Sequence, residues 1–168
     1  MREKCKHIFL AGHSMGGILS LILGCKHKID GIITIGAPVG INQFGAKLAP
    51  FFSIFLKYRA IDWKELKRES NGKWVGYQKI PLNIVKKINR LIKEMKNSLS
   101  EIKCPVLLMQ GRKDAVIKKY SMDFLLQNLN TKTKKAIWLE NNDHPILLSP
   151  DHDIIVSEIV KFIKTVIS

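Results

Sequence analysis

Three side chains that lie far apart in the sequence have the types that acyl-transfer chemistry uses: Ser14, Asp114 and His144. A serine hydroxyl is a weak nucleophile until an imidazole within hydrogen-bonding distance takes its proton. A buried carboxylate then keeps the imidazole in the required tautomer. Their order along the chain, nucleophile, acid and histidine, is one in which such triads occur. The sequence therefore predicts a nucleophilic serine site, provided that the fold brings these residues together.

Ser14 lies in a Gly-x-Ser-x-Gly turn between two apolar stretches, residues 7–11 and 18–23. This pattern predicts a strand, a sharp turn and a helix, the context in which the motif is informative. The serine of such a turn is strained and exposed, and the next N–H, that of Met15, points at a developing oxyanion. The alternative is a glycine-rich connection with an incidental serine, but the flanking strand and helix favour the catalytic interpretation.

The glycines around Ser14 predict close packing in this turn. We expect Gly12 and Gly16 to leave space where the strand and the helix approach each other. Gly17 is expected to let the start of the helix lie against its neighbours. The helix N-terminus would add partial positive charge where negative charge forms during acyl transfer.

Further apolar stretches predict the sheet that positions the candidate residues. Residues 31–38 and 104–111 are short and mainly apolar, as is typical of parallel strands buried on both faces, and residues 135–140 are predicted to form a fourth strand. With residues 7–11 they predict four parallel strands flanked by helices, and residues 120–129 predict one of these helices. The candidate serine, aspartate and histidine follow the first, third and fourth strands. In open α/β sheets, chemistry occurs at the carboxyl ends of the strands.

The last helix is predicted to begin after Ser149, which would be its N-cap, with Pro150 at its first position. Asp151 and Asp153 in its first turn would complement the helix dipole. Its apolar stripe is formed by Ile155, Ile159, Ile163 and Val166.

The base and the acid each have an alternative nearby in the sequence. His144 is the favoured base because residues 141–145 form a loop that leaves a strand, whereas His152 lies in the first turn of the last helix. Asp114 is the favoured acid because Asp143, adjacent to His144, points elsewhere if His144 faces the serine.

Residues 41–100 differ in character from the rest of the chain and are expected to form an insertion of helices and loops over the strand ends, without another strand. The insertion either packs its apolar face on the domain or forms a cap whose underside receives an apolar acyl chain. Both alternatives need the same apolar residues at helical spacing. These are Leu82, Ile84, Val85, Ile88, Leu91, Ile92, Met95 and Leu99, preceded by patches with Phe44, Phe51, Phe52, Ile54, Phe55, Leu56, Trp63 and Trp74.

The length and the composition favour a single globular domain, and the distribution of the lysines does not favour a nucleic-acid function. The 168 residues, 46% of them hydrophobic, suffice for one domain with segments 1–40, 41–100 and 101–168. A net charge of +14 would suit nucleic acid or an anionic membrane surface. The lysines are scattered through every segment without a nucleic-acid motif, so we expect a solvated basic surface. Binding through the lysines is a lesser alternative, which predicts retention on DNA with a steep salt dependence.

The cysteines indicate a reducing compartment, because Cys5, Cys25 and Cys104 are far apart, odd in number and without metal-ligand spacing. We expect no metal and no cofactor. No stretch approaches the roughly 18 apolar residues of a membrane span. The sequence therefore predicts a cytoplasmic protein without stable membrane insertion.

Four segments carry a resemblance to a known family: GHSMGG at 12–17, GAP at 36–38, PVLLMQGRKD at 105–114 and the loop of His144. Through them the chain resembles the α/β-hydrolase serine esterases of the carboxylesterase and monoacylglycerol lipase type. The resemblance spans essentially the whole chain, with the middle segment in the place of the family's cap. It implies an α/β-hydrolase fold.

The resemblance also implies roles and a substrate class. Ser14 would be the nucleophile, Asp114 the acid and His144 the base, and the backbone N–H of Met15 would be one oxyanion donor. The implied activity is hydrolysis of carboxylic esters, and the aromatic and aliphatic content of the middle segment favours a short to medium acyl chain or a monoacylglycerol. The implied partner is thus a small-molecule ester with an apolar acyl group.

The sequence departs from this family at its N-terminal side. In the family several strands precede the nucleophile strand, and a loop among them gives the second oxyanion N–H. The chain resembles only the C-terminal portion of the fold, so its first strand would have an open edge that invites self-association. Losing one oxyanion donor typically costs about 10² to 10³ in turnover. The alternative function is therefore a catalytically impaired fragment that serves as a binding module or needs a missing N-terminal half.

Overall fold

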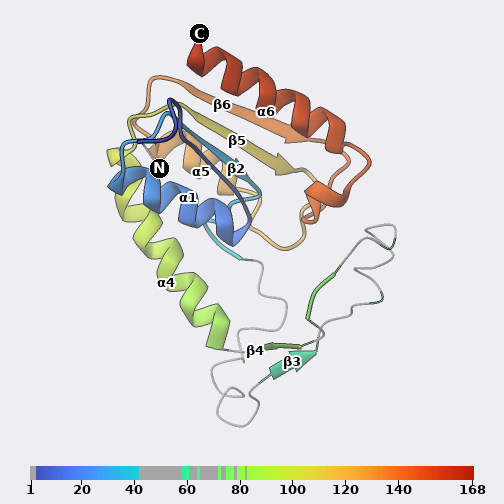
Figure 1. The fold of residues 1–168 in the computed structure, drawn as a ribbon. Coiled ribbons are helices and arrows are strands. Elements are labelled where there is room, and N and C mark those ends of the chain that lie inside the picture. The colour runs from blue at the N-terminus through green and yellow to red at the C-terminus, as the bar shows by residue number, and fades with distance from the viewer. Residues whose placement is uncertain are drawn as a thin grey trace.

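A four-stranded parallel sheet in the order β1-β2-β5-β6 forms the centre of the molecule (Figure 1). The structure, a computed structural model, describes residues 3–41, 58–60, 64, 72, 75–77, 79–81 and 83–168. The strands are β1 (Phe9–His13), β2 (Gly31–Ile35), β5 (Val106–Gly111) and β6 (Lys134–Leu139). The four predicted parallel strands and the α/β class are confirmed.

Helices cover both faces of the sheet because alternate side chains of its central strands point to opposite faces. Ile32 and Leu108 pack with α1, α4 and α5 on one face, whereas Ile33 and Leu107 pack with α6 on the other. Every residue of β2 and β5 is buried, as their continuous apolar sequences predict. The helices are α1 (Met15–Lys26), α4 (Asn83–Ser98), α5 (Ser121–Asn128) and α6 (His152–Ile167), with short 3₁₀ helices at Leu99–Glu101 and Ile146–Leu148.

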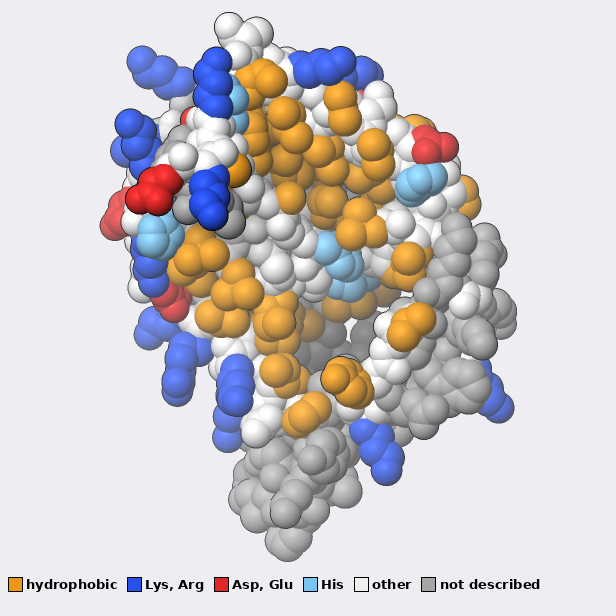
Figure 2. Space-filling view, viewed as in Figure 1, with side chains coloured by type: hydrophobic (Ala, Val, Ile, Leu, Met, Phe, Trp, Pro, Cys, Tyr) orange, Lys and Arg blue, Asp and Glu red, His pale blue; other side chains and the backbone are white. Residues whose placement is uncertain are grey.

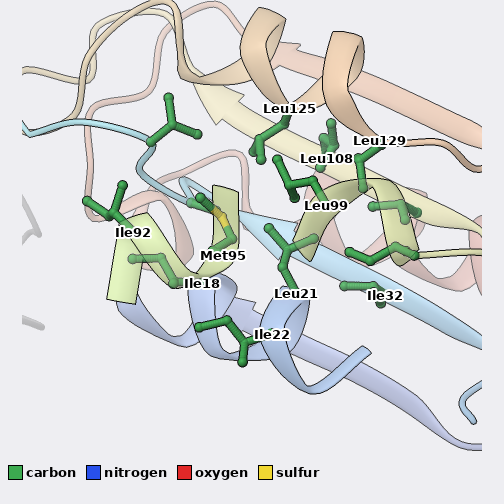
Figure 3. Packing of buried hydrophobic residues seen from close by; sticks show 14 of the residues in the cluster. Ile18, Leu21, Ile22, Ile32, Ile92, Met95, Leu99, Leu108, Leu125 and Leu129 are labelled. Carbon is green, nitrogen blue, oxygen red and sulfur yellow. The ribbon is translucent and has the colours of Figure 1, made fainter. Parts of the chain in front are cut away.

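The larger core cluster anchors α1 on the sheet. Figure 3 shows Leu21 of α1, Met95 of α4 and Leu125 of α5 gathered around Ile32 and Leu108 of the sheet. Burying a side chain of this size contributes about 1.5–3 kcal/mol. The turn between β1 and α1 is therefore held at both ends, by strand pairing on one side and by this core on the other.

The middle segment contains strand structure that the sequence interpretation did not anticipate. Strands β3 (Tyr58–Ala60) and β4 (Lys79–Pro81) form a two-stranded antiparallel sheet. The expectation of an insertion without another strand is therefore wrong. The aromatic patches predicted between residues 44 and 74 lie outside the described residues.

The predicted helix of the middle segment is confirmed as α4, and the C-terminal part of its apolar stripe packs on the domain. Ile92 and Met95 are buried in the same cluster as Leu21, and Ile88 and Leu91 pack against it in part. For this half of α4, the packing alternative therefore accounts for the stripe.

The last helix begins later than its sequence signals predict. Its first residue is His152, and Asp151 occupies the N-cap position without a side-chain cap hydrogen bond. Ser149 instead accepts a hydrogen bond from the Asp151 N–H at 3.3 Å, closing a turn before the helix. The predicted stripe is confirmed, with Ile155 buried and its other members packed against the α6 side of the sheet. Among the described helices, none combines the length and hydropathy that a membrane crossing requires.

Candidate active site

Ser14 lies in the turn between β1 and α1 in a conformation that side chains rarely adopt. Its φ is +54°, and among the described residues it is the only non-glycine residue with positive φ. Its backbone N–H donates to the carbonyl oxygen of Ile35 at 2.8 Å, which fixes the turn to β2. The strained conformation predicted for this serine is confirmed, and strain of this kind persists only where the surrounding structure imposes it.

The packing predicted for the glycines is confirmed at Gly12 and Gly17 and wrong at Gly16. A Cβ atom on Gly12 would overlap the backbone of Gly16, and one on Gly17 would lie 2.8 Å from the Cβ of Ala37. A Cβ on Gly16 would meet no atom within 4 Å. The backbone of the first helical turn thus restricts β1, whereas the side-chain position of Gly16 faces open space.

Asp114 lies in the loop after β5, and backbone N–H groups of this loop hold its carboxylate in place. One carboxylate oxygen, Oδ1, accepts hydrogen bonds from the N–H groups of Val116 at 2.9 Å and Ile117 at 3.1 Å. The residue is 2% exposed. Because both donors belong to its own loop, the second oxygen, Oδ2, has a fixed direction.

His144 follows β6 and links Asp114 to Ser14. Its Nδ1 lies 2.8 Å from Asp114 Oδ2, and its Nε2 lies 2.9 Å from Ser14 Oγ. An ionised carboxylate only accepts hydrogen bonds, so Nδ1 carries the hydrogen and Nε2 is left to accept the serine hydroxyl. The structure brings these predicted side chains into one hydrogen-bonded chain from separate strands.

The side chains of the alternative base, His152, and the alternative acid, Asp143, bond to groups outside the hydrogen-bonded chain from Ser14 to Asp114. His152 is more than half exposed at the start of α6, with its Nε2 3.1 Å from Asp153 Oδ1. Asp143 accepts hydrogen bonds through Oδ1 from the N–H groups of Ala115 at 3.1 Å and His144 at 2.6 Å. It therefore joins the two loops of the site through their backbones.

Gly36 at the end of β2 is a site residue to which sequence reasoning gave no role beyond closing a strand. Its φ is +58°, and a Cβ there would lie 3.6 Å from His144 Nδ1 and 3.7 Å from Asp114 Oδ2. The backbone beneath the imidazole–carboxylate pair thus adopts a conformation that favours glycine. The Gly-Ala-Pro sequence is the only local signal that could have found it.

His13 is a second residue to which the sequence interpretation assigned no role. Its Nε2 lies 2.8 Å from the carbonyl oxygen of His144, and the two ring centroids are 5.0 Å apart. Burial lowers the pKa of His13, and the positive charge of a protonated His144 would lower it further. The hydrogen bond to the carbonyl of His144 and the charge of Asp114 act in the opposite direction.

The backbone N–H of Met15, the predicted oxyanion donor, is the first N–H of α1. The first N–H groups of a helix lack partners within the helix, and the dipole places partial positive charge there. The oxyanion that forms on a carbonyl group attacked by Ser14 Oγ would lie next to this end of α1. Among the described residues, no cluster of three or more His, Cys, Asp or Glu side chains could hold a metal ion.

Comparison with known proteins agrees with this architecture. Residues 1–151 match the model of the Hydrolase_4 family, described as serine aminopeptidase, S33. The chain belongs to this α/β-hydrolase family. Over 96% of its length, this Hydrolase_4 member is 26% identical to a carboxylesterase of Bacillus subtilis (strain 168) and 29% identical to a thermostable monoacylglycerol lipase of Bacillus sp. (strain H-257).

The similarity covers only part of these relatives. The Hydrolase_4 chain spans 65% of the Bacillus subtilis carboxylesterase and 64% of the monoacylglycerol lipase. A solved structure from work on the metagenome-derived lipolytic enzymes LipS and LipT superposes with a TM-score of 0.85 at 23% identity. That superposition covers 98% of this chain and 67% of the other. At this identity it supports the fold.

Proposed function

We propose that this chain carries the catalytic site of a serine hydrolase that cleaves carboxylic esters. The observation on which the proposal depends is the hydrogen-bonded chain from Ser14 through His144 to Asp114. In this proposal Ser14 is the nucleophile, His144 the general base and Asp114 the acid that orients it. Membership of a hydrolase family and similarity to a carboxylesterase and a monoacylglycerol lipase support it.

The proposed reaction proceeds through an acyl-enzyme. Ser14 Oγ attacks the ester carbonyl while His144 Nε2 takes the hydroxyl proton, giving a tetrahedral oxyanion next to the Met15 N–H. The oxyanion collapses as the ester C–O bond breaks, and His144 gives its proton to the leaving alcohol. A water molecule, deprotonated by His144, then attacks the acyl-serine carbonyl, which releases the acid and returns the proton to Ser14.

We assign a short to medium acyl chain or a monoacylglycerol as the substrate class. The side chain of Met15, next to Ser14, is 42% exposed, and Leu19 one turn further along α1 is 39% exposed. Figure 2 shows hydrophobic side chains next to histidines on this face of the molecule. Apolar side chains beside the serine are better suited to contact the apolar acyl part of an ester than to contact a charged substrate. The monoacylglycerol lipase among the relatives supports this assignment.

Labelling with a fluorophosphonate probe tests the proposal, because the probe bonds covalently to an activated serine. The folded wild-type chain should be labelled at neutral pH, and Ser14→Ala should not. Ser168→Ala is the matched control, since Ser168 lies at the end of α6 and bonds only locally through its hydroxyl to Thr165 O. Absence of label on the folded wild-type chain, or equal labelling of Ser14→Ala, would contradict the proposed activity.

A series of p-nitrophenyl esters tests the acyl preference separately. Hydrolysis of the butyrate and octanoate esters should exceed that of the palmitate ester, and each rate should vanish in Ser14→Ala. Fastest hydrolysis of palmitate would overturn the acyl assignment without affecting the proposed serine chemistry.

A second proposed function is that of an incomplete hydrolase that gains activity from further polypeptide. Among the described residues, β1 pairs only with β2, so its other edge is open. Along α1, which begins at the site, Met15, Leu19 and Leu23 are each about 40% exposed. These residues are spaced four apart and therefore form one stripe on the helix. An open strand edge with neighbouring apolar side chains favours association.

Complementation distinguishes the two functions. The part of the Bacillus subtilis carboxylesterase that this chain does not match is mixed with the chain, and ester turnover and molecular mass are measured. A large increase in turnover with formation of a heterodimer supports the second function. An active monomer whose turnover does not change contradicts it. A homodimer that forms without the added polypeptide would indicate self-association through the open edge.

A further inference from the structure

A hydrogen bond between the His13 side chain and the backbone carbonyl of His144 joins the end of β1 to the loop after β6. The carbonyl oxygen of His144 lies 2.8 Å from His13 Nε2 although the residues are 131 positions apart. A carbonyl oxygen only accepts, so His13 Nε2 carries a hydrogen and donates it. The rings lie 5.0 Å apart at 39°, so His13 also contacts the imidazole of the base.

This bond is one of a small set that holds the backbone of His144 in place. The same carbonyl oxygen accepts from the N–H of Ile146 at 2.7 Å, a bond within the same loop just before the 3₁₀ helix Ile146–Leu148. The N–H of His144 donates to Asp143 Oδ1, in the same loop. Of these contacts, only the one from His13 comes from the segment that carries Ser14. It therefore couples the position of the base to that of the nucleophile.

A neutral His13 is suited to donate a hydrogen bond to the His144 carbonyl. The charged and titratable groups that act on it are His144 and Asp114, and burial is the largest influence on its pKa, lowering it from the usual value. A neutral imidazole has one N–H, and in His13 this N–H is used at the His144 carbonyl. His13 thus adds no positive charge beside the imidazolium that forms on His144 during acyl transfer.

We propose that His13 is a positioning residue, whose Nε2–H donates to the His144 backbone carbonyl and holds the His144 imidazole at bonding distance from Ser14. The inference rests on the proposed function, since it assigns His13 a task in that reaction. Acyl transfer is sensitive to small displacements of the reacting groups. Loss of the bond is therefore expected to slow attack by the serine without weakening the binding of the ester.

Two substitutions separate the hydrogen bond from ring packing. His13→Phe retains an aromatic ring and removes the donor, and it should slow fluorophosphonate labelling and lower kcat about tenfold, with KM little changed. His13→Gln can place an amide N–H near the position of Nε2 and should recover most of the rate. His152→Phe is the matched control, because His152 is more than half exposed outside the site and its substitution should leave the labelling rate unchanged.

Rates are expressed per labelled serine, so that a loss of folded protein alone does not count as a loss of rate. A purely structural role for His13 would lower the unfolding midpoint or the labelled fraction while the rate per labelled serine stayed at the wild-type value. That result would overturn the inference. Equal rates for His13→Phe and the wild-type chain would overturn it as well.

Nitrogen NMR of ¹⁵N-histidine protein tests the inference without relying on hydrolysis. At neutral pH, His13 should be neutral with its hydrogen on Nε2, and His13→Phe should broaden or shift the ring signals of His144. A hydrogen on Nδ1 of His13, or His144 signals that do not respond, would contradict the proposed positioning. A wild-type chain with the expected NMR signals but no labelling would count against the proposed esterase function and leave the positioning contact supported.

Discussion

The carboxylate of Asp143 accepts a hydrogen bond from the backbone N–H of Ala115 at 3.1 Å, which ties the loop after β6 to the loop after β5. Through the same oxygen Asp143 accepts from the N–H of His144 at 2.6 Å. Ala115 follows Asp114 directly. The acid and the base of the proposed site are therefore joined by their backbones as well as by their side chains.

Asp143→Ala should separate these loops. Two hydrogen bonds to a carboxylate are lost, which predicts a destabilisation of about 1–3 kcal/mol and slower labelling of Ser14. Urea unfolding and fluorophosphonate kinetics measure the two effects. Asp143→Asn is the matched control, because its amide oxygen can still accept both N–H groups. A labelling rate that is equal in Asp143→Ala and the wild-type chain would argue against a role for this link in the site.

Asp114→Asn should abolish most of the proposed activity while leaving the chain folded. The amide oxygen can take the place of Oδ1 and accept from Val116 and Ile117. The amide nitrogen then faces His144 Nδ1 and favours the tautomer in which Nε2 cannot accept the serine proton. We expect kcat to fall by about 10⁴, with a far-ultraviolet circular dichroism spectrum like that of the wild-type chain. A fall of less than about tenfold would argue against Asp114 as the acid.

Gly12→Ala and Gly16→Ala form a matched pair in the nucleophile turn. The first places a Cβ against the backbone of Gly16, and the second places it in open space. Gly12→Ala should therefore yield little folded protein, whereas Gly16→Ala should be as stable as the wild-type chain or up to about 1 kcal/mol more stable, since alanine favours helix. Thermal unfolding of the two variants measures the difference. Equal stability would contradict the close approach of β1 to α1.

Gly36→Ala tests the conformation beneath the imidazole–carboxylate pair. At a φ of +58° an alanine costs about 1–2 kcal/mol, and its Cβ would sit 3.6 Å from His144 Nδ1 without overlapping it. We therefore expect lower stability, measured by urea unfolding, with a smaller change in the labelling rate of the molecules that remain folded. A labelling rate reduced as strongly as in Asp114→Asn would show that the backbone at Gly36 also sets the position of the base.

Glu158 gives α6 a pH-dependent link to β6. Two hydrogen bonds, the larger contribution coming from Lys135 and the smaller from Lys161, lower the pKa of Glu158 to about 2. A pKa below that of the unfolded chain means that the carboxylate stabilises the fold above about pH 4.3 and that this contribution is lost as the pH falls toward 2. Both lysine side chains are more than half exposed, so the contribution is under about 1 kcal/mol.

Glu158→Gln should therefore unfold slightly more easily than the wild-type chain at pH 7. The difference should shrink toward zero at pH 2 and in high salt, where the charges are screened. Urea unfolding of both proteins at the two pH values checks this expectation. A difference that grows on acidification would contradict the assigned ion pairs.

The sequence alone determined the secondary structure that frames the site and the residue types in it. Mainly apolar stretches predicted β2 and β5 because a strand covered on both faces has no position that faces solvent. Ser14, Asp114 and His144 were predicted to act together because each of them follows a different strand of the same sheet. Such signals are local, since periodicity and turn chemistry within a short window decide which faces a segment can bury.

Local signals were insufficient where pairing or a single turn decides the structure. The strands Tyr58–Ala60 and Lys79–Pro81 are too short to carry a periodic pattern, and they become strands only by pairing with each other. Ser149, a good N-cap by type, closes a preceding turn instead, because a serine oxygen serves either arrangement equally well. Gly16 looked like a packing glycine, but which neighbour approaches it depends on how α1 lies against β1.

Only the tertiary structure decided which of the candidate residues meet. Ser14 and His144 are 130 positions apart, and their 2.9 Å contact depends on strand order and on the conformation of two loops. The same loops exclude His152, turn Asp143 toward backbone N–H groups and bring His13 to the His144 carbonyl. No local pattern encodes these contacts, because each arises from segments that become neighbours only when the sheet assembles.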